Sequence, residues 1–238
     1  MEDKTAGHCQ LVAREQIFNQ LRQRLGVGEI DTARRTSVDK RLQLHPMNTV
    51  PARAKLAHAA LIDSFEQRIS AYQASVSRIT KLDSIPQAIS GYLGPKLNDV
   101  TINAEVEALN LPFETAPGLK IIPWSPKTSM RVSITCCVAA IAETGSVVIA
   151  SSSRNGISQN FLGDIHIVIL KAEDIVGAYE EIWHRIRLAG RLPRHITFIS
   201  GPSCTGDIEM VMEYGAHGPR QLHIIIVGMS PQDYQPLP

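Results

Sequence analysis

The sequence predicts an α/β protein, with a Rossmann-like, mostly parallel sheet that carries helices on both faces, preceded by an N-terminal helical region. Apolar residues recur at helical spacing in two stretches of residues 1–83, whereas from residue 84 they gather in short runs typical of strands. Residues 1–82 hold 13 Lys and Arg against 8 Asp and Glu, and the remaining residues hold 11 against 15. We therefore expect a helical region over 1–83, an α/β domain over 84–230 and an extended or disordered tail over 231–238.

The N-terminal region contains two stretches with helical periodicity. A first helix is expected over Cys9–Leu25, where Gly26 supplies a stop, and residues 26–50 are expected to be an exposed connection. From Pro51 onwards, apolar residues step by three and four up to Ile79, which predicts one long helix. Its apolar stripe suits either a partner chain or the protein's own domain, and we favour the second because coiled coils sustain this pattern for longer.

Short apolar runs after residue 84 are the strand candidates. They are Asp99–Asn103, Lys120–Pro123, Arg131–Thr135, Ser146–Ala150, Ile165–Leu170, Ile196–Ser200 and Leu222–Val227. Helices are expected between the last three, at Ala172–Leu188 and Gly206–Tyr214. Alternating strands and helices are typical of βαβ units, so residues 165–228 are expected to form a Rossmann-type half. Ligands of such sheets bind beyond the carboxyl ends of the strands.

Composition argues against several classes of function. A net charge of +1 and a pI near 7.8 do not suggest a nucleic-acid-binding protein. The apolar stretch Val132–Ala150 is interrupted by Glu143 and polar neighbours, so no membrane span is expected. The N-terminal segment lacks the features of a secretory signal, which predicts a cytoplasmic protein. Four scattered cysteines without CxxC or HExxH spacing predict neither disulfides nor a metal site.

The segment over residues 198–209 runs from a predicted strand, through a loop of glycine and hydroxyl residues, into a predicted helix. Backbone N–H groups at a helix N-terminus, with Ser203 and Thr205 as further donors, suit a phosphate or carboxylate. Asp207 and Glu209 are also the residues that any first helical turn prefers, and they would repel a nearby anion.

Two further segments carry residues with chemical potential. Glu143 lies with Thr144 and Gly145 between two apolar runs, where a hairpin turn and a functional carboxylate explain the pattern equally well. His217 lies between glycines, which suits acid–base work or anion binding, although a helix end followed by a turn explains the glycines. The candidate catalytic residues are Glu143, Asp207, Glu209 and His217. The candidate ligand-binding residues are Thr144, Gly145, Gly201, Ser203, Thr205, Gly206, Asp207, His217 and Gly218. His166, which alternates with apolar residues, is interpreted as a sheet residue.

Four segments together resemble a known family. They are AIAETGS at 140–146, DIHIVIL at 164–170, ISGPSCTGDIE at 199–209 and GAHGPRQLHIIIV at 215–227. In this order and spacing they are similar to the LUD domain of the lactate utilization protein C family, over about residues 130–228. The resemblance implies a bacterial, cytoplasmic protein with a fold like those of ribose-5-phosphate isomerases and CoA transferases. It also implies iron–sulfur partner subunits that act with this chain in oxidising L-lactate to pyruvate. The clusters are expected on those partners, and no cofactor is expected on this chain.

Two hypotheses for function follow. The first is an accessory subunit that contacts its partners through the N-terminal helices and binds a small carboxylate or phosphate at the strand ends. The second is a free-standing enzyme of the isomerase or CoA-transferase type, or a small-anion-binding protein, that uses Glu143 and the 201–209 loop. Cys204 departs from the family pattern, because it stands where the family usually has Arg or Lys.

Overall fold

The computed structural model describes residues 3–26, 32–95, 99–125, 131–190, 192–206 and 212–228, with the side chains of residues 3–12 left out of the description. By its contacts the chain divides into two units, Met1–Asn48 and Thr49–Pro238. The predicted tail over 231–238 lies outside the described residues.

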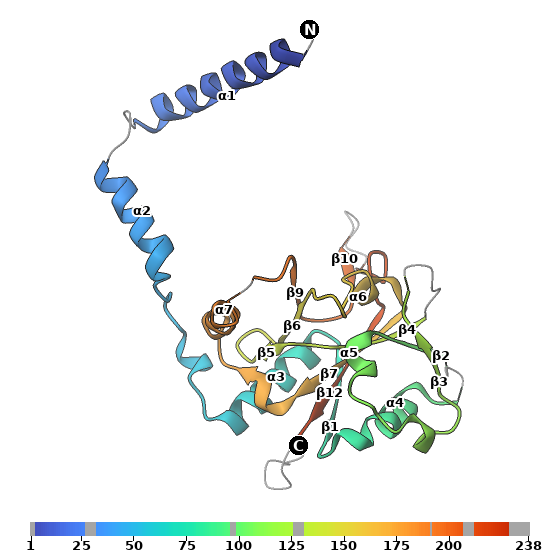
Figure 1. The fold of residues 1–238 in the computed structure, drawn as a ribbon. Coiled ribbons are helices and arrows are strands. Elements are labelled where there is room, and N and C mark those ends of the chain that lie inside the picture. Colours follow the sequence, from blue (N-terminus) through green and yellow to red (C-terminus); the bar gives the residue numbers. More distant parts are fainter. Residues whose placement is uncertain are drawn as a thin grey trace. The chain divides into compact units, whose positions relative to one another are not determined.

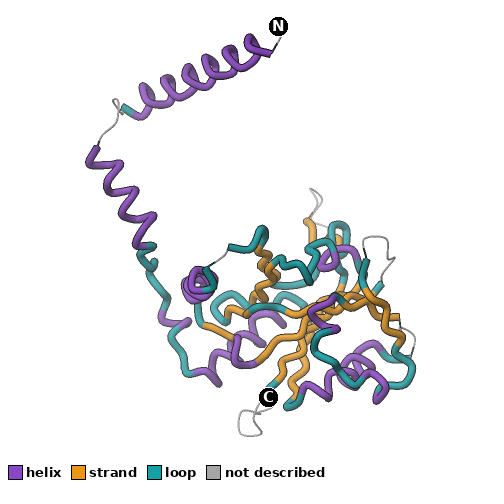
Figure 2. The backbone as a smooth tube through the Cα atoms, in the orientation of Figure 1, coloured by secondary structure: helices purple, strands orange, loops and turns teal. Residues whose placement is uncertain are grey.

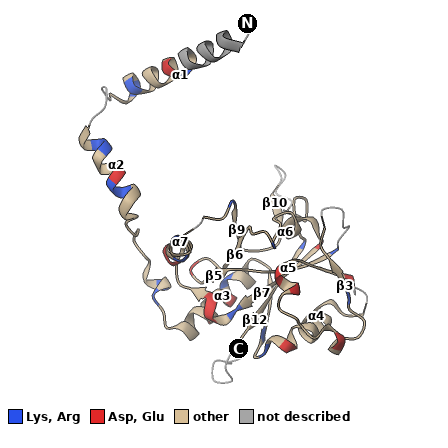
Figure 3. Ribbon diagram, in the orientation of Figure 1, with Lys and Arg blue, Asp and Glu red and all other residues tan. Residues whose placement is uncertain are grey.

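The first unit contains two helices, α1 (Asp3–Leu25) and α2 (Thr32–Leu44) (Figure 1). Helix α1 includes the predicted helix over Cys9–Leu25. Residues 26–50, expected to be an exposed connection, contain helix α2, and the described residues 32–49 are exposed. This helix has no buried residue, so no apolar stripe marked it in the sequence. Its charged residues are mostly basic (Figure 3).

The second unit is built around a six-stranded sheet in which every neighbouring pair of strands is parallel. Its strands are β1 (Ser75–Ile79), β2 (Asp99–Ile102), β3 (Lys120–Pro123), β4 (Val132–Cys136), β7 (Ile165–Lys171) and β12 (Gln221–Val227). Their order is β1-β12-β7-β4-β2-β3. The central strands β7 and β12 are buried on both faces, as their continuous runs of Ile, Val and Leu indicate.

A second, four-stranded sheet has the order β8-β5-β6-β9. Its strands are β5 (Ala139–Ile141), β6 (Ser146–Ala150), β8 (Ile175–Val176) and β9 (Ile196–Ile199). Strand β6 is antiparallel to both β5 and β9. The prediction of one Rossmann-type half over 165–228 is therefore wrong in part: β7 and β12 are adjacent and parallel, but β9 belongs to the other sheet. All four residues of β9 are only partly buried, unlike those of a central parallel strand.

Helices cover both faces of the six-stranded sheet, which confirms the predicted fold class (Figures 1 and 2). Helices α4 (Ile85–Leu93) and α5 (Ala104–Glu107) pack on one face, against side chains such as Ile167. Helix α3 (His58–Ala71) and the four-stranded sheet pack on the other, against side chains such as Val168. Helix α7 (Tyr179–Leu188) covers the outer face of the four-stranded sheet.

The remaining elements are short. They are α6 (Gln159–Leu162), the hairpin strands β10 (Cys204–Gly206) and β11 (Met212–Tyr214), and 3-10 turns at Ala52–Ala54, Leu82–Ser84, Phe113–Thr115 and Ala172–Asp174.

The long helix predicted from Pro51 to Ile79 is wrong at its C-terminal end. Helix α3 stops at Ala71, Gln73 has φ 67°, and the chain continues as β1. Val76 packs into the core on one side of the large sheet and Ile79 into the core on the other. Val76 and Ile79 are three residues apart, a spacing that places two side chains on one face of a helix but on opposite faces of a strand. The apolar pattern is therefore compatible with a helix and with a strand that is covered on both faces. Because α3 and β1 pack with the α/β body, the boundary between units lies at 48/49, not at the predicted 83/84.

Both helices predicted near the C-terminus require correction. The stretch Ala172–Leu188 is helical only from Tyr179, and a 3-10 turn and strand β8 precede it. The predicted helix Gly206–Tyr214 is not formed by its described residues, because β10 and β11 pair as antiparallel strands on either side of residues 207–211. The loop after β9 therefore leads into a hairpin strand, and the expected helix N-terminus at Gly206 is absent from the described structure.

Candidate functional site

A pocket of about 350 Å³ lies beside the edge strand β9. Its described lining residues are Asn160, Phe161, His166, Thr197, Phe198, Ile199, Ser200, Gly201, Pro202, Ser203, Cys204, Thr205, His217, Gly218, Pro219 and Leu222. His166 and Leu222 are the second residues of β7 and β12. The pocket therefore lies at the amino-terminal ends of β7 and β12. A ligand was expected at the carboxyl ends of these parallel strands, as in Rossmann-type sheets. Only the loop that follows β9 comes from the carboxyl end of a strand.

The loop after β9 is held in place by backbone contacts on two sides. The Ser203 N–H donates to the Pro219 carbonyl at 2.8 Å, and the Gly215 N–H donates to the Ser203 carbonyl at 2.9 Å. A Cβ at Gly201 would lie 2.6 Å from the Tyr72 carbonyl oxygen, so the close approach of this loop to the end of α3 requires glycine. These contacts fix the wall that faces β7.

Two buried polar residues, Asn160 and His166, and one partly buried residue, Thr197, line the pocket. Asn160 in α6 is 1% exposed, and within the described structure neither its Nδ2 nor its Oδ1 has a hydrogen-bond partner. The hydroxyl oxygen of Thr197 is also buried without a partner there. His166 is 1% exposed and its Nε2 lies 2.8 Å from the Thr135 hydroxyl. Burial lowers the pKa of His166 from 6.5 to about 4, so its imidazole is neutral at pH 7.

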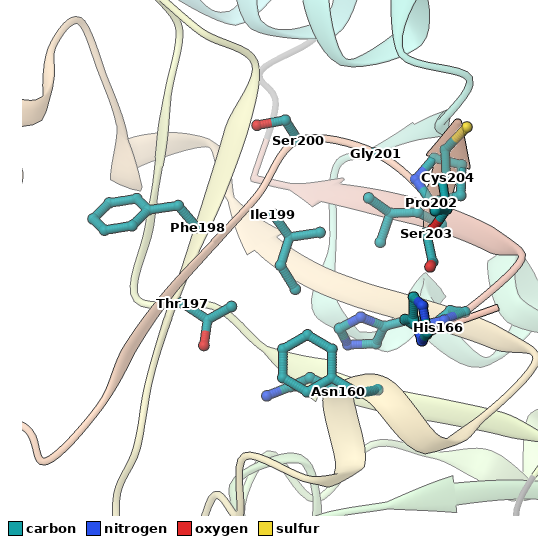
Figure 4. A pocket seen from close by; sticks show the side chains of 16 residues that line it. Asn160, His166, Thr197, Phe198, Ile199, Ser200, Gly201, Pro202, Ser203 and Cys204 are labelled. Carbon is teal, nitrogen blue, oxygen red and sulfur yellow. The ribbon is translucent and has the colours of Figure 1, made fainter. Parts of the chain in front are cut away.

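Figure 4 shows the side chains that line the pocket. Asn160 and His166 lie together below the loop, and the Ser203 hydroxyl points from the loop towards them. The Cys204 thiol points away from them. The inner part of the pocket is thus polar but formally uncharged, since no described lining residue is Lys, Arg, Asp or Glu.

The structure brings together some of the predicted ligand-binding residues and separates others. Those that line the pocket are Gly201, Ser203, Thr205, His217 and Gly218. Thr144, Gly145 and Gly206 do not line it, and Asp207 and Glu209 lie outside the described residues.

Sequence reasoning missed three polar lining residues. Asn160 belongs to a four-residue helix without any periodic pattern, and Thr197 is an ordinary strand residue. The sequence identifies His166 only as a sheet residue, and its one signal is a polar side chain within the apolar run of β7.

The turn that contains Glu143 is a hairpin turn between β5 and β6. Arg53 Nη2 donates to Glu143 Oε1 at 2.8 Å, and the glutamate side chain is 12% exposed. Gly145 has φ +62°, and a Cβ there would lie 2.7 Å from the Ile69 nitrogen in α3. The carboxylate and the glycine are therefore explained by the docking of the segment that leads into α3.

A chain of hydroxyls joins this turn to the pocket loop. Thr144 Oγ1 lies 2.8 Å from Ser146 Oγ, which lies 2.7 Å from Ser200 Oγ. Glu143 itself does not line the pocket, and this hydroxyl chain connects its turn to the pocket residue Ser200.

Comparison with known proteins places the chain in a family. The LUD domain model matches residues 128–227. Lactate utilization protein C from Deinococcus radiodurans is 31% identical over 208 residues, which cover 84% of this chain and 93% of that protein. The chain belongs to the lactate utilization protein C family. A second member of the family, from Halalkalibacterium halodurans, is 25% identical over 90% of this chain and 97% of its own length.

A solved structure supports the fold. The crystal structure of a DUF162 family protein from Deinococcus radiodurans has a TM-score of 0.55 to this chain, at 23% identity, and covers 73% of this chain and 99% of that one. The part of the chain that matches the LUD domain includes the Glu143 turn and every described residue of the pocket. The pocket is therefore a feature of the LUD domain in this family member.

The cysteines differ in their surroundings. Cys204 is exposed at the pocket loop. Burial raises the pKa of Cys136 to about 12 and that of Cys137 well above 9, which keeps both thiols protonated. Among the described residues, no three His, Cys, Asp or Glu side chains gather as a metal site would require. None of the helices in that part of the chain combines the length and apolar character of a membrane span.

Proposed function

We propose that this protein serves lactate utilization as an accessory subunit of a system that oxidises L-lactate to pyruvate. The observation that carries the proposal is the likeness to lactate utilization protein C over 84% of the chain. The proposal places iron–sulfur clusters on partner subunits. The thiols of Cys136 and Cys137 are partly buried, and their pKa values are raised, so both are protonated, whereas cluster ligands are thiolates.

The N-terminal helices supply the surface proposed to contact those partners. Four apolar side chains of α1 are between 43% and 71% exposed: Ile17, Phe18, Leu21 and Leu25. At the turn angle of an α-helix these positions lie within an arc of about 100°. An exposed apolar stripe of this kind is typical of a surface that another protein covers. Helix α2, with four basic residues and one acidic residue, adds a positively charged surface.

The alternative of a free-standing CoA-transferase-like enzyme needs Glu143 as nucleophile or base. That carboxylate accepts a hydrogen bond from Arg53 and lies outside the pocket, so the geometry favours the role of subunit.

The test combines growth with co-purification. We expect a deletion strain to grow poorly on L-lactate and normally on pyruvate, with growth restored by the wild-type gene. Tagged protein from lactate-grown cells should co-purify with iron-containing proteins, and a Phe18→Ser/Leu21→Ser variant should lose them, because it removes the centre of the apolar stripe. A Glu15→Gln/Gln23→Ser variant, which changes exposed polar residues of the same helix, is the matched control. Normal growth of the deletion strain on L-lactate would overturn the proposal.

A further inference from the structure

We propose that the inner end of the pocket binds an uncharged group that both donates and accepts hydrogen bonds, such as the amide edge of a carboxamide or of a lactam ring. The inference rests on the pocket alone and not on the role in lactate oxidation.

The first step is the unmet hydrogen-bonding capacity of Asn160. A buried carboxamide offers N–H donors and a carbonyl acceptor, and here both atoms lack partners within the described structure. Leaving such groups unsatisfied is costly, so a buried pair of this kind indicates a missing partner. An amide edge satisfies both atoms at once, since its carbonyl accepts from Nδ2 and its N–H donates to Oδ1. This complementarity holds for either assignment of the two side-chain atoms.

The second step is the charge of the surroundings. A carboxylate placed against Asn160 would accept from Nδ2 but would set an oxygen against Oδ1 without a proton between them. It would also be buried with no cation nearby, because no described residue of the lining is Lys or Arg and His166 is neutral. Burial of an unpaired charge is strongly unfavourable. An ionised part of a ligand would therefore stay at the exposed mouth, where His217 lies.

The third step is size. A volume of about 350 Å³ exceeds what a three-carbon acid fills and falls at the lower end of sites for larger organic molecules. Ile199 and Leu222 line the pocket beside the polar residues and offer apolar contact to the body of such a ligand. The ligand class is thus a small amide or lactam with an apolar or planar body.

The experiment compares ligands that differ only in the charged group. Nicotinamide is titrated against nicotinate, and lactamide against lactate, into the purified full-length protein by calorimetry at pH 7.5. We expect the amide of at least one pair to bind about tenfold or more tightly than its acid. Equal or tighter binding of the acids, or no binding of either amide at millimolar concentration, would overturn the inference.

Two variants connect the binding to the proposed atoms. Asn160→Leu removes the carboxamide at similar volume, and we expect amide binding to fall about tenfold or more without a loss of thermal stability. Asn155→Leu is the matched contrast. Asn155 is similarly buried, but its Oδ1 accepts a hydrogen bond from Asn103 Nδ2 at 3.1 Å, so the melting temperature of this variant should fall. Thr197→Val, an isosteric change at the other unpartnered atom, should also weaken amide binding while the protein stays folded. Unchanged amide affinity in Thr197→Val and Asn160→Leu would contradict the assignment. If Asn160→Leu fails to fold, Asn160 has a structural role and the assignment is wrong.

The result is separable from that of the growth test. Binding is measured on the isolated protein, whereas the role in lactate oxidation is measured by growth and co-purification. Amide binding together with normal growth of the deletion strain would support this inference and contradict the proposed function. Absent amide binding together with poor growth of the deletion strain on L-lactate would contradict this inference and support the proposed function.

Discussion

Acidification from pH 7.5 to about pH 5 is expected to destabilise the protein because two buried histidines must remain neutral in the folded state. His166 lies within the central strand β7. His223 is 2% exposed in β12, between the hydroxyls of Ser75 and Ser77 at 2.8 and 3.1 Å. Burial lowers the pKa of each from 6.5 to about 4.

The sign and size follow from the difference in proton binding. Between these two pKa values the unfolded chain binds a proton that the folded chain does not, so stability is full above pH 6.5 and falls as the pH approaches 4. From pH 7.5 to pH 5, each histidine then accounts for a loss of about 2 kcal/mol, or about 4 kcal/mol for both. This is a large share of the free energy of unfolding of an ordinary domain.

Urea unfolding at a series of pH values, followed by circular dichroism, measures this loss. The variants His166→Gln and His223→Gln should each remove about half of the pH dependence between pH 7.5 and 5, whatever their effect on stability at pH 7.5. His217→Gln is the control, because His217 is exposed. The free energy of unfolding of this variant should depend on pH as that of the wild type does. A wild-type stability that is flat over this range, or a slope that neither buried variant reduces, would refute the reasoning.

Three further outcomes are expected from local packing. Gly145→Ala should lower the free energy of unfolding in urea by roughly 2–4 kcal/mol, because it combines a positive φ with overlap against α3; Gly91→Ala, in open space within α4, should be neutral or slightly stabilising. Gly177→Ala should also lower the melting temperature, since its Cβ would overlap a backbone carbonyl. Under native conditions a maleimide should label Cys204 well before Cys137, because Cys204 is exposed, whereas Cys137 is partly buried and its thiol pKa is raised. Mass spectrometry of peptides would show the order, and equal rates would contradict this difference.

The fold could be predicted where one strand sits between two layers. Strands β7 and β12 are buried on both faces and therefore appear in the sequence as continuous apolar runs. The same logic fails for β1, whose two packed residues are spaced as they would be on a helix, and for α2, which buries nothing. It also cannot tell which sheet a strand joins, and the assignment of β9 failed for that reason.

The pocket was predictable only in its loops. The glycine and hydroxyl residues at 201–205, and the glycines on either side of His217, are visible in the sequence because turns concentrate such residues. The buried polar residues did not, since the contact that buries Asn160 is tertiary and leaves no periodic trace in four residues of helix.

The proposed position of the site depends on which polar groups have no hydrogen-bond or ion-pair partner within the described part of the protein. Glu143 is one of the catalytic candidates of the sequence, but its carboxylate is paired with Arg53 and its turn is fixed by contact with α3. His223 is likewise bonded on both ring nitrogens. Asn160 and Thr197 differ, because both line the pocket and the buried polar atoms of their side chains have no hydrogen-bond partner among the described residues. Polar groups with partners inside the protein stabilise the fold, whereas the side chains of Asn160 and Thr197 are proposed to hydrogen-bond a ligand in the pocket.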